Sequence, residues 1–119
     1  MKQLFAVAFS GLFAACASAP PPTEQMALAR SAIEDAQGAG APESAPRELN
    51  AARVRLDEAR RAGEANDNDV ARRLAEEAEA DAKLAAAKAR STRATAAVTA
   101  VQDSLRTLRE ELDRASRAP

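Results

Sequence analysis

Apolar residues recur at helical spacing along most of this chain, and the longest such segment covers residues 67–116. It contains neither Pro nor Gly and consists mainly of Ala, Leu, Glu, Lys and Arg, which have a low intrinsic cost in a helix. The polar run Asn66–Asp69 precedes it, and its short side chains can accept hydrogen bonds from the free N–H groups of a first turn. The pattern predicts one helix of about 50 residues, a rod of roughly 75 Å.

The apolar positions of this long helix change face near residues 91–95. Before this point they are small, with alternating four- and three-residue spacing, and Val70, Leu74 and Leu84 flank them as the only large side chains. After it they are larger and follow the three- and four-residue spacing of a coiled-coil seam. The small set is Ala71, Ala75, Ala78, Ala82, Ala85 and Ala89. The large set, which we call the distal seam, is Val98, Val101, Leu105, Leu108 and Leu112.

A shorter helical pattern covers about residues 23–38. Thr23 is its expected N-cap, and the glycines at its end are expected to stop it before a loop at residues 41–43. Its apolar face consists of Met26, Ala29, Ile33 and Ala36.

A second short helix is predicted at about residues 45–62. Pro46 lies at its first turn, where the missing N–H costs nothing, and Gly63 is the expected C-cap. Its apolar face consists of Leu49, Ala52, Leu56 and Ala59, while Val54 lies off this line. Short connections make neighbouring helices antiparallel.

These patterns predict an all-α fold, with two short antiparallel helices packed on the first half of one long C-terminal helix. Apart from three Phe residues within the first thirteen positions, the chain has no aromatic residue, and its apolar content is mostly Ala. A thin three-helix bundle, in which Ala lets helices approach closely, fits this composition better than a thick globular core.

The lengths of the predicted helices do not match. Each short helix spans only about 25 Å, so the two cover at most the first half of the long one. The distal seam is then left without a partner in its own chain, and we expect it to contact another helix, from a second copy or from another protein. The alternative is a weakly amphipathic, fraying tail.

The first 15 residues are predicted to form a helical signal peptide. A positively charged start at Lys2 is followed by an apolar run over residues 4–15. This run is too short to span a bilayer, which needs about 20 apolar residues, but has the length of a signal-peptide core. Residues 16–22 then form a short Pro-rich tether.

The end of this apolar run resembles the processing box of bacterial lipoproteins, with small residues directly before the sole cysteine of the chain. The matching residues are Leu12, Phe13, Ala14, Ala15 and Cys16, where Phe13 departs from the usual Leu. The resemblance implies that Cys16 becomes the mature N-terminus and carries diacylglycerol and an amide-linked acyl chain such as palmitate.

The residue after the modified cysteine is Ala17 and not the Asp that retains many such proteins in the inner membrane. The resemblance therefore implies a lipid anchor in the outer membrane of a Gram-negative bacterium, with the protein facing the periplasm. The alternative is an ordinary secretory signal cleaved near Ala17 or Ala19, in which Cys16 has no special role.

Charge and composition argue against several other classes of function. The chain has 17 basic and 18 acidic residues, and the two signs are mixed along the predicted helices and not grouped in blocks. This argues against a nucleic-acid site, which needs a basic face. It contains no His and only one Cys, so we expect no enzyme activity, no metal site and no cofactor other than the covalent lipid. The acidic run at residues 66–69 is similar to a calcium loop, but Arg72 and Ala78 occupy the places of the required Gly and Glu. Helix capping by Asp67 explains it better.

The chain after the signal resembles a family of small bacterial lipoproteins built on the domain of unknown function 4398. The matching segments are residues 27–29, 31–33, 45–49, 52–59 and 71–82. The second short helix and the long helix also resemble one tetratricopeptide-type hairpin, although a repeat array needs about three units. The family offers no catalytic residues.

We therefore expect a lipid-anchored envelope protein with a non-catalytic structural or adaptor role, acting through its long helix. The alternative is a periplasmic carrier or chaperone that binds lipid or an unfolded outer-membrane protein along a helical groove.

Overall fold

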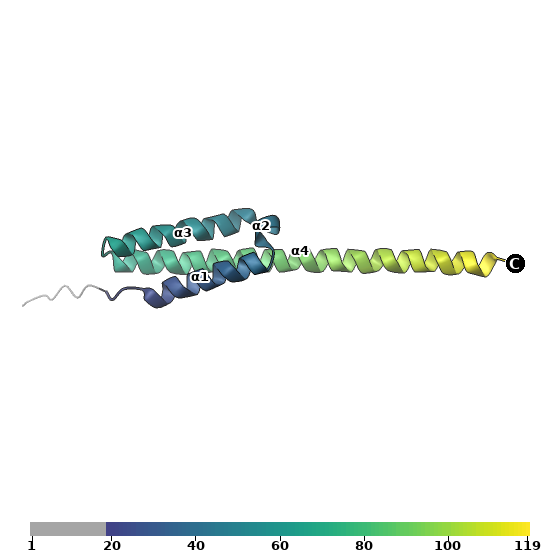
Figure 1. Cartoon of the computed structure of the whole chain (residues 1–119), viewed down its shortest axis with the longest axis horizontal. Coiled ribbons are helices and arrows are strands. Elements are labelled where there is room, and N and C mark those ends of the chain that lie inside the picture. Colours follow the sequence, from purple (N-terminus) through teal and green to yellow (C-terminus); the bar gives the residue numbers. More distant parts are fainter. Residues whose placement is uncertain (1–18) are drawn as a thin grey trace, which may run out of the picture.

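The computed structural model describes residues 19–119, which form helices joined by short connections (Figure 1). The fold is all-α, as predicted, with two shorter helices lying along the first part of one long C-terminal helix. The helices are α1 (Thr23–Gly38), α2 (Ala41–Ser44), α3 (Pro46–Glu64) and α4 (Asn68–Arg117). The predicted signal peptide lies outside the described residues.

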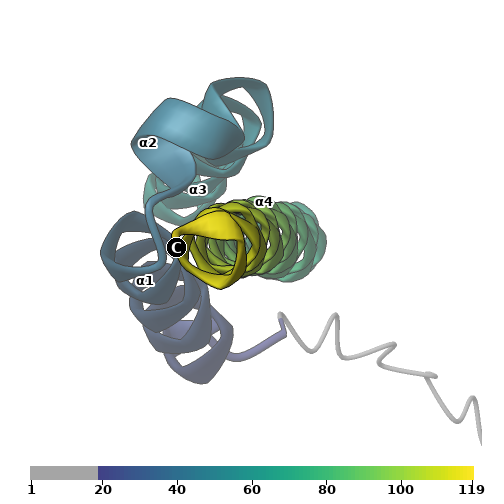
Figure 2. The same ribbon diagram turned by 90° about the vertical axis from the view of Figure 1, so that its right-hand side faces the viewer.

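The helix α1 runs in the same direction as α4, and α3 runs in the opposite direction (Figure 1). At one end of the bundle, Asn68 Nδ2 donates to the carbonyl oxygen of Ala19 at 2.6 Å. At the other end, Arg93 Nη2 donates to the carbonyl oxygen of Ala39 at 3.0 Å. Viewed along the long axis, α1 and α3 lie on two sides of α4, and no other helix of residues 19–119 covers its remaining side (Figure 2).

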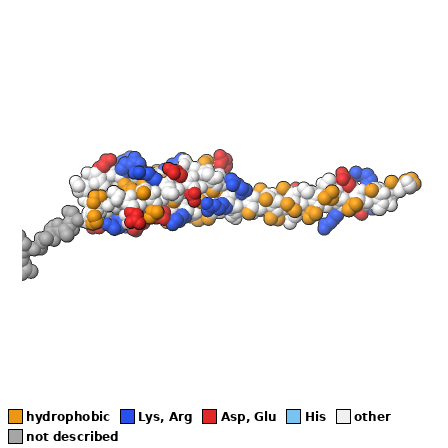
Figure 3. Space-filling view, turned by 60° about the horizontal axis from the view of Figure 1, so that its bottom comes forward, with side chains coloured by type: hydrophobic (Ala, Val, Ile, Leu, Met, Phe, Trp, Pro, Cys, Tyr) orange, Lys and Arg blue, Asp and Glu red, His pale blue; other side chains and the backbone are white. Residues whose placement is uncertain are grey.

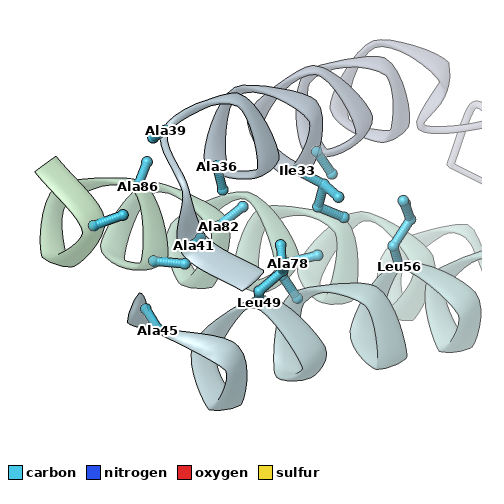
Figure 4. Packing of buried hydrophobic residues seen from close by; sticks show 14 residues of the cluster. Ile33, Ala36, Ala39, Ala41, Ala45, Leu49, Leu56, Ala78, Ala82 and Ala86 are labelled. Atoms are coloured by element: carbon cyan, nitrogen blue, oxygen red, sulfur yellow. The ribbon is translucent and has the colours of Figure 1, made fainter. Parts of the chain in front are cut away.

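The face of α4 that contacts α1 and α3 consists of alanines. All six residues of the small set identified from the sequence are buried, and Ala86 joins them. The large core side chains come from the short helices: Ile33 from α1, and Leu49 and Leu56 from α3 (Figure 4). Because an alanine projects only one carbon from the backbone, this face lets the short helices pack close to α4 over several turns.

Ion pairs across the α3–α4 contact support the register of these two helices. Arg55 on α3 lies 3.2 Å from Glu77 and also pairs with Asp81, both on α4. Near the start of α3, Glu48 pairs with Lys88. The hydrogen bond from the Lys88 ammonium lowers the pKa of the Glu48 carboxyl below its ordinary value of 4.5.

The connection between α1 and α3 differs from the predicted loop at residues 41–43. Gly40 adopts a left-handed conformation with φ of 88°, and Ala41–Ser44 then form the short helix α2. Pro42 is accommodated within its first turn, where no N–H is needed. Ala41 and Ala45 are buried against the bundle, and this burial holds the short helix in place.

The helix ends also differ in detail from the prediction. Thr23 is the first helical residue of α1 and not its N-cap, a position that Pro22 takes without a side-chain hydrogen bond. α3 continues through Gly63 to Glu64, and the left-handed residue of the following turn is Asn66, with φ of 60°. Gly63 itself faces α4, where a Cβ placed on it would lie 3.8 Å from the Cβ of Ala71, an ordinary van der Waals contact.

Two further predictions concern α4. Asp67 caps this helix as expected, since its Oδ1 accepts from the backbone N–H of Val70 at 3.4 Å. Val70, Leu74 and Leu84, the large side chains predicted to flank the small set, stay out of the core: the first two are partly buried, and Leu84 is 47% exposed. They lie beside the alanine face and remain partly or largely in solvent.

Candidate interaction surface on the distal half of α4

The covered part of α4 ends shortly after Ala89, which is the last buried residue of the helix. Every residue from Arg90 to Pro119 is exposed. Arg93 is the last side chain of α4 with a hydrogen bond to another element among residues 19–119. The distal half of α4 therefore projects beyond the bundle as a single helix (Figure 1).

The distal seam lies along this projecting helix. Its five residues are between 47% and 69% exposed, with Leu105 the least and Leu112 the most exposed. The structure brings all five onto one side of α4, because alternating steps of three and four residues return to the same face of a helix. Hydrophobic side chains are visible along the projecting rod in Figure 3.

The distal seam and the buried alanines occupy nearly opposite faces of α4. Val98 follows Ala89 by nine residues, which is about 2.5 turns and so about half a turn out of phase. On the distal half, the line that continues the buried alanines is mostly polar: Thr92, Ala96, Thr99, Asp103, Arg106 and Glu110. Because this line becomes polar, longer versions of α1 or α3 would find no apolar face to pack against on the distal half of α4.

The apolar line of the distal seam also continues backward onto the bundle. Leu84, Ala87, Ser91 and Ala94 precede Val98 with the same alternating spacing, and all four are exposed. We call the combined set the α4 stripe: Leu84, Ala87, Ser91, Ala94, Val98, Val101, Leu105, Leu108, Leu112 and Ala115. The spacing of large residues alone does not identify this extension, because alanines occur on both faces of α4 and only burial separates the two sets.

Several hydroxyl groups of the distal half form hydrogen bonds within the helix itself. Side chains of Thr95, Thr99, Ser104 and Thr107 each donate to the carbonyl oxygen four residues earlier, at 2.9–3.1 Å. Such bonds slightly weaken a helix. A projecting helix with several of them gains stability when its apolar face is covered by a partner.

The bundle also has shallow surface depressions. One of about 280 Å³ lies between α1 and α4 and is lined by apolar and charged residues that include Leu28, Asp35 and Lys83. Another of about 420 Å³ lies beside Pro22 and Met26. Their sizes are at or near the lower end for small-molecule sites, which range over about 300–1,000 Å³. The α4 stripe is by far the longer continuous apolar feature.

Several sequence-based expectations fall on other parts of the chain. Cys16 and the processing-box residues Leu12, Phe13, Ala14 and Ala15 lie outside the described residues. Within residues 19–119, no three His, Cys, Asp or Glu side chains gather as metal ligands would. None of the helices described combines the length and hydropathy needed to cross a membrane.

The family model described as "Domain of unknown function (DUF4398)" matches residues 24–101, more than half of the chain. The chain belongs to the DUF4398 family. The DUF4398 match covers α1, α2, α3 and the first part of α4, including Val98 and Val101 of the distal seam. Leu105, Leu108 and Leu112 lie beyond it. No curated protein and no solved structure matches the chain.

Proposed function

We propose that this DUF4398 protein is a lipid-anchored, periplasm-facing protein of the bacterial outer membrane that acts as a non-catalytic structural or adaptor module. Its bundle serves as a base, and the α4 stripe serves as the surface that binds another protein. The observation that carries the proposal is the exposure of the five distal-seam side chains on a helix that projects beyond its own bundle.

Energetics support a binding role for the distal seam. Fully burying one large aliphatic side chain stabilises by about 1.5–3 kcal/mol. The distal-seam residues are about half exposed, so covering all five would contribute roughly 4–7 kcal/mol per chain. Single exposed aliphatic residues are ordinary on protein surfaces, but a row at coiled-coil spacing is typical of a helix that binds another helix.

The position of the N-terminal tether agrees with this role. Ala19 contacts Asn68, the first residue of α4, whereas the distal seam lies toward the other end of a helix roughly 75 Å long. A lipid on Cys16, inferred from its processing box, would therefore hold the start of α4 near a membrane. The far end of the helix then reaches proteins at a distance from the anchor.

The chemistry of the chain supports a non-catalytic role. It contains no His to act as a general base at neutral pH, and its single thiol is the proposed attachment point of the lipid. Several charged side chains in α3 and in the covered part of α4 form ion pairs, such as Arg55 with Glu77 and Glu79 with Lys83, which support the helices.

The proposal is tested on the full-length chain extracted from its own membrane in mild detergent. Leu105→Ser combined with Leu108→Ser should lower the mass of the extracted complex to that of a single chain. The matched control, Arg106→Ser with Glu110→Ser, changes the opposite face and should leave the complex intact. A complex that survives the Leu105 and Leu108 changes would contradict the proposal. It would also be contradicted if the unsubstituted protein is extracted as a single chain that binds apolar probes, which is the behaviour of a carrier.

The anchor is tested separately by Cys16→Ser. If Cys16 carries the lipid, this change moves the protein from the membrane fraction to the soluble fraction. A Cys16→Ser protein that still sediments with the outer membrane would overturn the lipid anchor but leave the binding role of the α4 stripe untouched.

A further inference from the structure

We infer that the occupant of the α4 stripe is the stripe of a second copy, running antiparallel, with a two-fold axis midway between Val98 and Val101. The inference rests on the proposed function, because it names the partner of the same surface. Three features carry it: the order of large and small residues along the stripe, the charges beside it, and the exposure of Leu84 on the bundle.

The first feature is the distribution of side-chain size. The stripe is bulky in its distal half and small through Ala87, Ser91 and Ala94, and it ends with Leu84 at one end and Ala115 at the other. In the antiparallel register every layer except the central one combines a large residue with a small one. The layers are Leu84 with Ala115, Ala87 with Leu112, Ser91 with Leu108, Ala94 with Leu105, and Val98 with Val101.

All ten positions of the stripe are used in this register, and the five layers have similar total volume. Similar layers keep two helices at an even separation and allow interior-like packing density. A parallel pair in register would instead place each residue against its own copy. Three successive layers of Ala87, Ser91 and Ala94 would then be small on both sides, next to layers of paired Leu or Val that hold the helices further apart.

The second feature is charge. The residues that flank the stripe are mainly basic near the bundle, with Lys83, Lys88 and Arg90, whereas Glu111 flanks it near the tip. The antiparallel register brings Arg90 of each copy beside Glu111 of the other, giving two attractive pairs. Arg90 is 60% exposed and so accessible to a second copy, although it also forms an exposed ion pair with Asp35 of its own chain at 3.6 Å.

The same register places Lys88 near Arg109 of the second copy, which is unfavourable. Lys88 already pairs with Glu48 of its own chain, and that carboxylate reduces the repulsion. A parallel pair would set Lys83 against Lys88 of the other copy and would leave Glu111 beside Ser116, with no attractive flanking pair at all. Charge therefore favours the antiparallel arrangement.

The third feature is the exposed part of the bundle. Leu84 is 47% exposed although α4 is covered on two sides at this level. Viewed along the long axis, α1 and α3 leave one side of α4 uncovered (Figure 2). In the antiparallel pair the tip of the second copy lies along this side, and Ala115 of that copy covers Leu84.

The size of the contact is adequate for a specific dimer. The stripe runs over about 32 residues, or about 48 Å, and a helix with side chains is about 10 Å wide. The covered strip is on the order of 500 Å² on each copy, or about 1,000 Å² in total, which is near the lower limit for a specific interface. The starts of the two α4 helices then lie at opposite ends of the dimer, roughly 95 Å apart.

Cysteine cross-linking on the full-length chain in its own membrane tests the arrangement. Two differently tagged copies, one carrying Ala87→Cys and the other Leu112→Cys, are co-expressed and oxidised. The antiparallel register predicts a mixed disulfide between them and none between two copies of the same variant, because equivalent positions lie about 25 residues, or roughly 37 Å, apart. Ala96→Cys, on the opposite face, is the control for random collision. Oxidation of the unsubstituted chain shows how much disulfide, if any, forms through Cys16.

Each outcome decides the inference. A mixed disulfide that exceeds the Ala96→Cys background by at least tenfold supports it. Disulfides between identical variants show a parallel pair and overturn it. If no disulfide exceeds the background, the second copy is not the occupant and the inference is overturned. The proposed function survives either failure if Leu105→Ser with Leu108→Ser still dissociates the native complex. The stripe is then still a binding surface, for a parallel second copy in the first case and for a different protein in the second.

Discussion

Arg93 donates a hydrogen bond from its Nη2 to the backbone carbonyl oxygen of Ala39, at 3.0 Å. Ala39 directly follows the last residue of α1, so this contact places a positive charge at the carboxyl end of that helix, where the helix dipole favours it. The pair marks where the bundle ends on α4. Before this point along the chain, α4 packs against α1 and α3 through its own alanines. After it, α4 is a single exposed helix.

Gly40, next to this contact, should not tolerate a side chain. Its φ of 88° is unfavourable for other residues, and an added Cβ would lie 3.2 Å from Arg93 Nη2. Gly40→Ala should lower the free energy of unfolding by about 1–2 kcal/mol, measured by urea denaturation. Gly38→Ala is the control: no atom lies within 4 Å of its added Cβ, and helix propensity should make it stabilising by roughly 0.5–1 kcal/mol. Equal effects at the two glycines would contradict the described turn.

Leu49 is the largest fully enclosed side chain of the bundle. Leu49→Ala should reduce the free energy of unfolding by about 2–5 kcal/mol, because it leaves a cavity between α3 and the alanine face of α4. Val54→Ala, on the same helix but 48% exposed, should cost less than about 1 kcal/mol. Thermal unfolding followed by circular dichroism measures both, and a Leu49 variant as stable as the Val54 variant would mean that α3 does not pack as described.

The ion pair between Glu48 and Lys88 should make stability depend on pH in acid. Lys88 lowers the pKa of the folded-state Glu48 carboxyl below its ordinary value of 4.5. The pair therefore contributes fully above pH 4.5, and its contribution is lost as the pH falls from 4.5 through the lowered pKa. The difference in Tm between the unsubstituted chain and Glu48→Gln should be constant above pH 4.5 and should shrink to zero as the pH falls from 4.5 through the lowered pKa. Glu58→Gln, an exposed change on the same helix, should show no such dependence; a Glu48→Gln difference that persists in strong acid would refute the pairing.

Hydrogen exchange should separate the two halves of α4. Backbone amides at residues 75–89 lie under α1 and α3, whereas those beyond residue 94 belong to a helix with no cover from residues 19–119. In single chains we expect exchange beyond residue 94 to be at least tenfold faster. Association through the α4 stripe should slow it, and Leu105→Ser with Leu108→Ser should restore the fast rate. Equal protection in both halves of a single chain would argue that the distal helix needs no partner.

Much of this fold was predictable because helical spacing was unambiguous. Alternating steps of four and three residues identified the buried face of α4, and every one of the six alanines predicted there is buried. The mismatch in helix lengths likewise identified the distal seam as uncovered, and its five residues are exposed. Both inferences depend only on the geometry of a helix and on counting residues.

The connections and edges were less predictable because tertiary contacts decide them. The short helix α2 exists because Ala41 and Ala45 are buried, which the local sequence does not reveal. Gly63 suggested a helix end, but α3 continues through it to Glu64, and Asn66 takes the left-handed conformation in the turn that follows. The backward extension of the distal seam through Ala87 was missed for a similar reason, since alanine favours both a tight interface and an exposed helix surface.

The most direct test of the central claim is photo-crosslinking of the full-length chain in intact membranes. A photoreactive amino acid in place of Leu108 lies on the α4 stripe. One in place of Glu110, two residues further along the helix, lies on the opposite face. If the stripe is a protein-binding surface, illumination should give a discrete adduct from Leu108 and none from Glu110. No adduct from Leu108, or equal adducts from both positions, would contradict it.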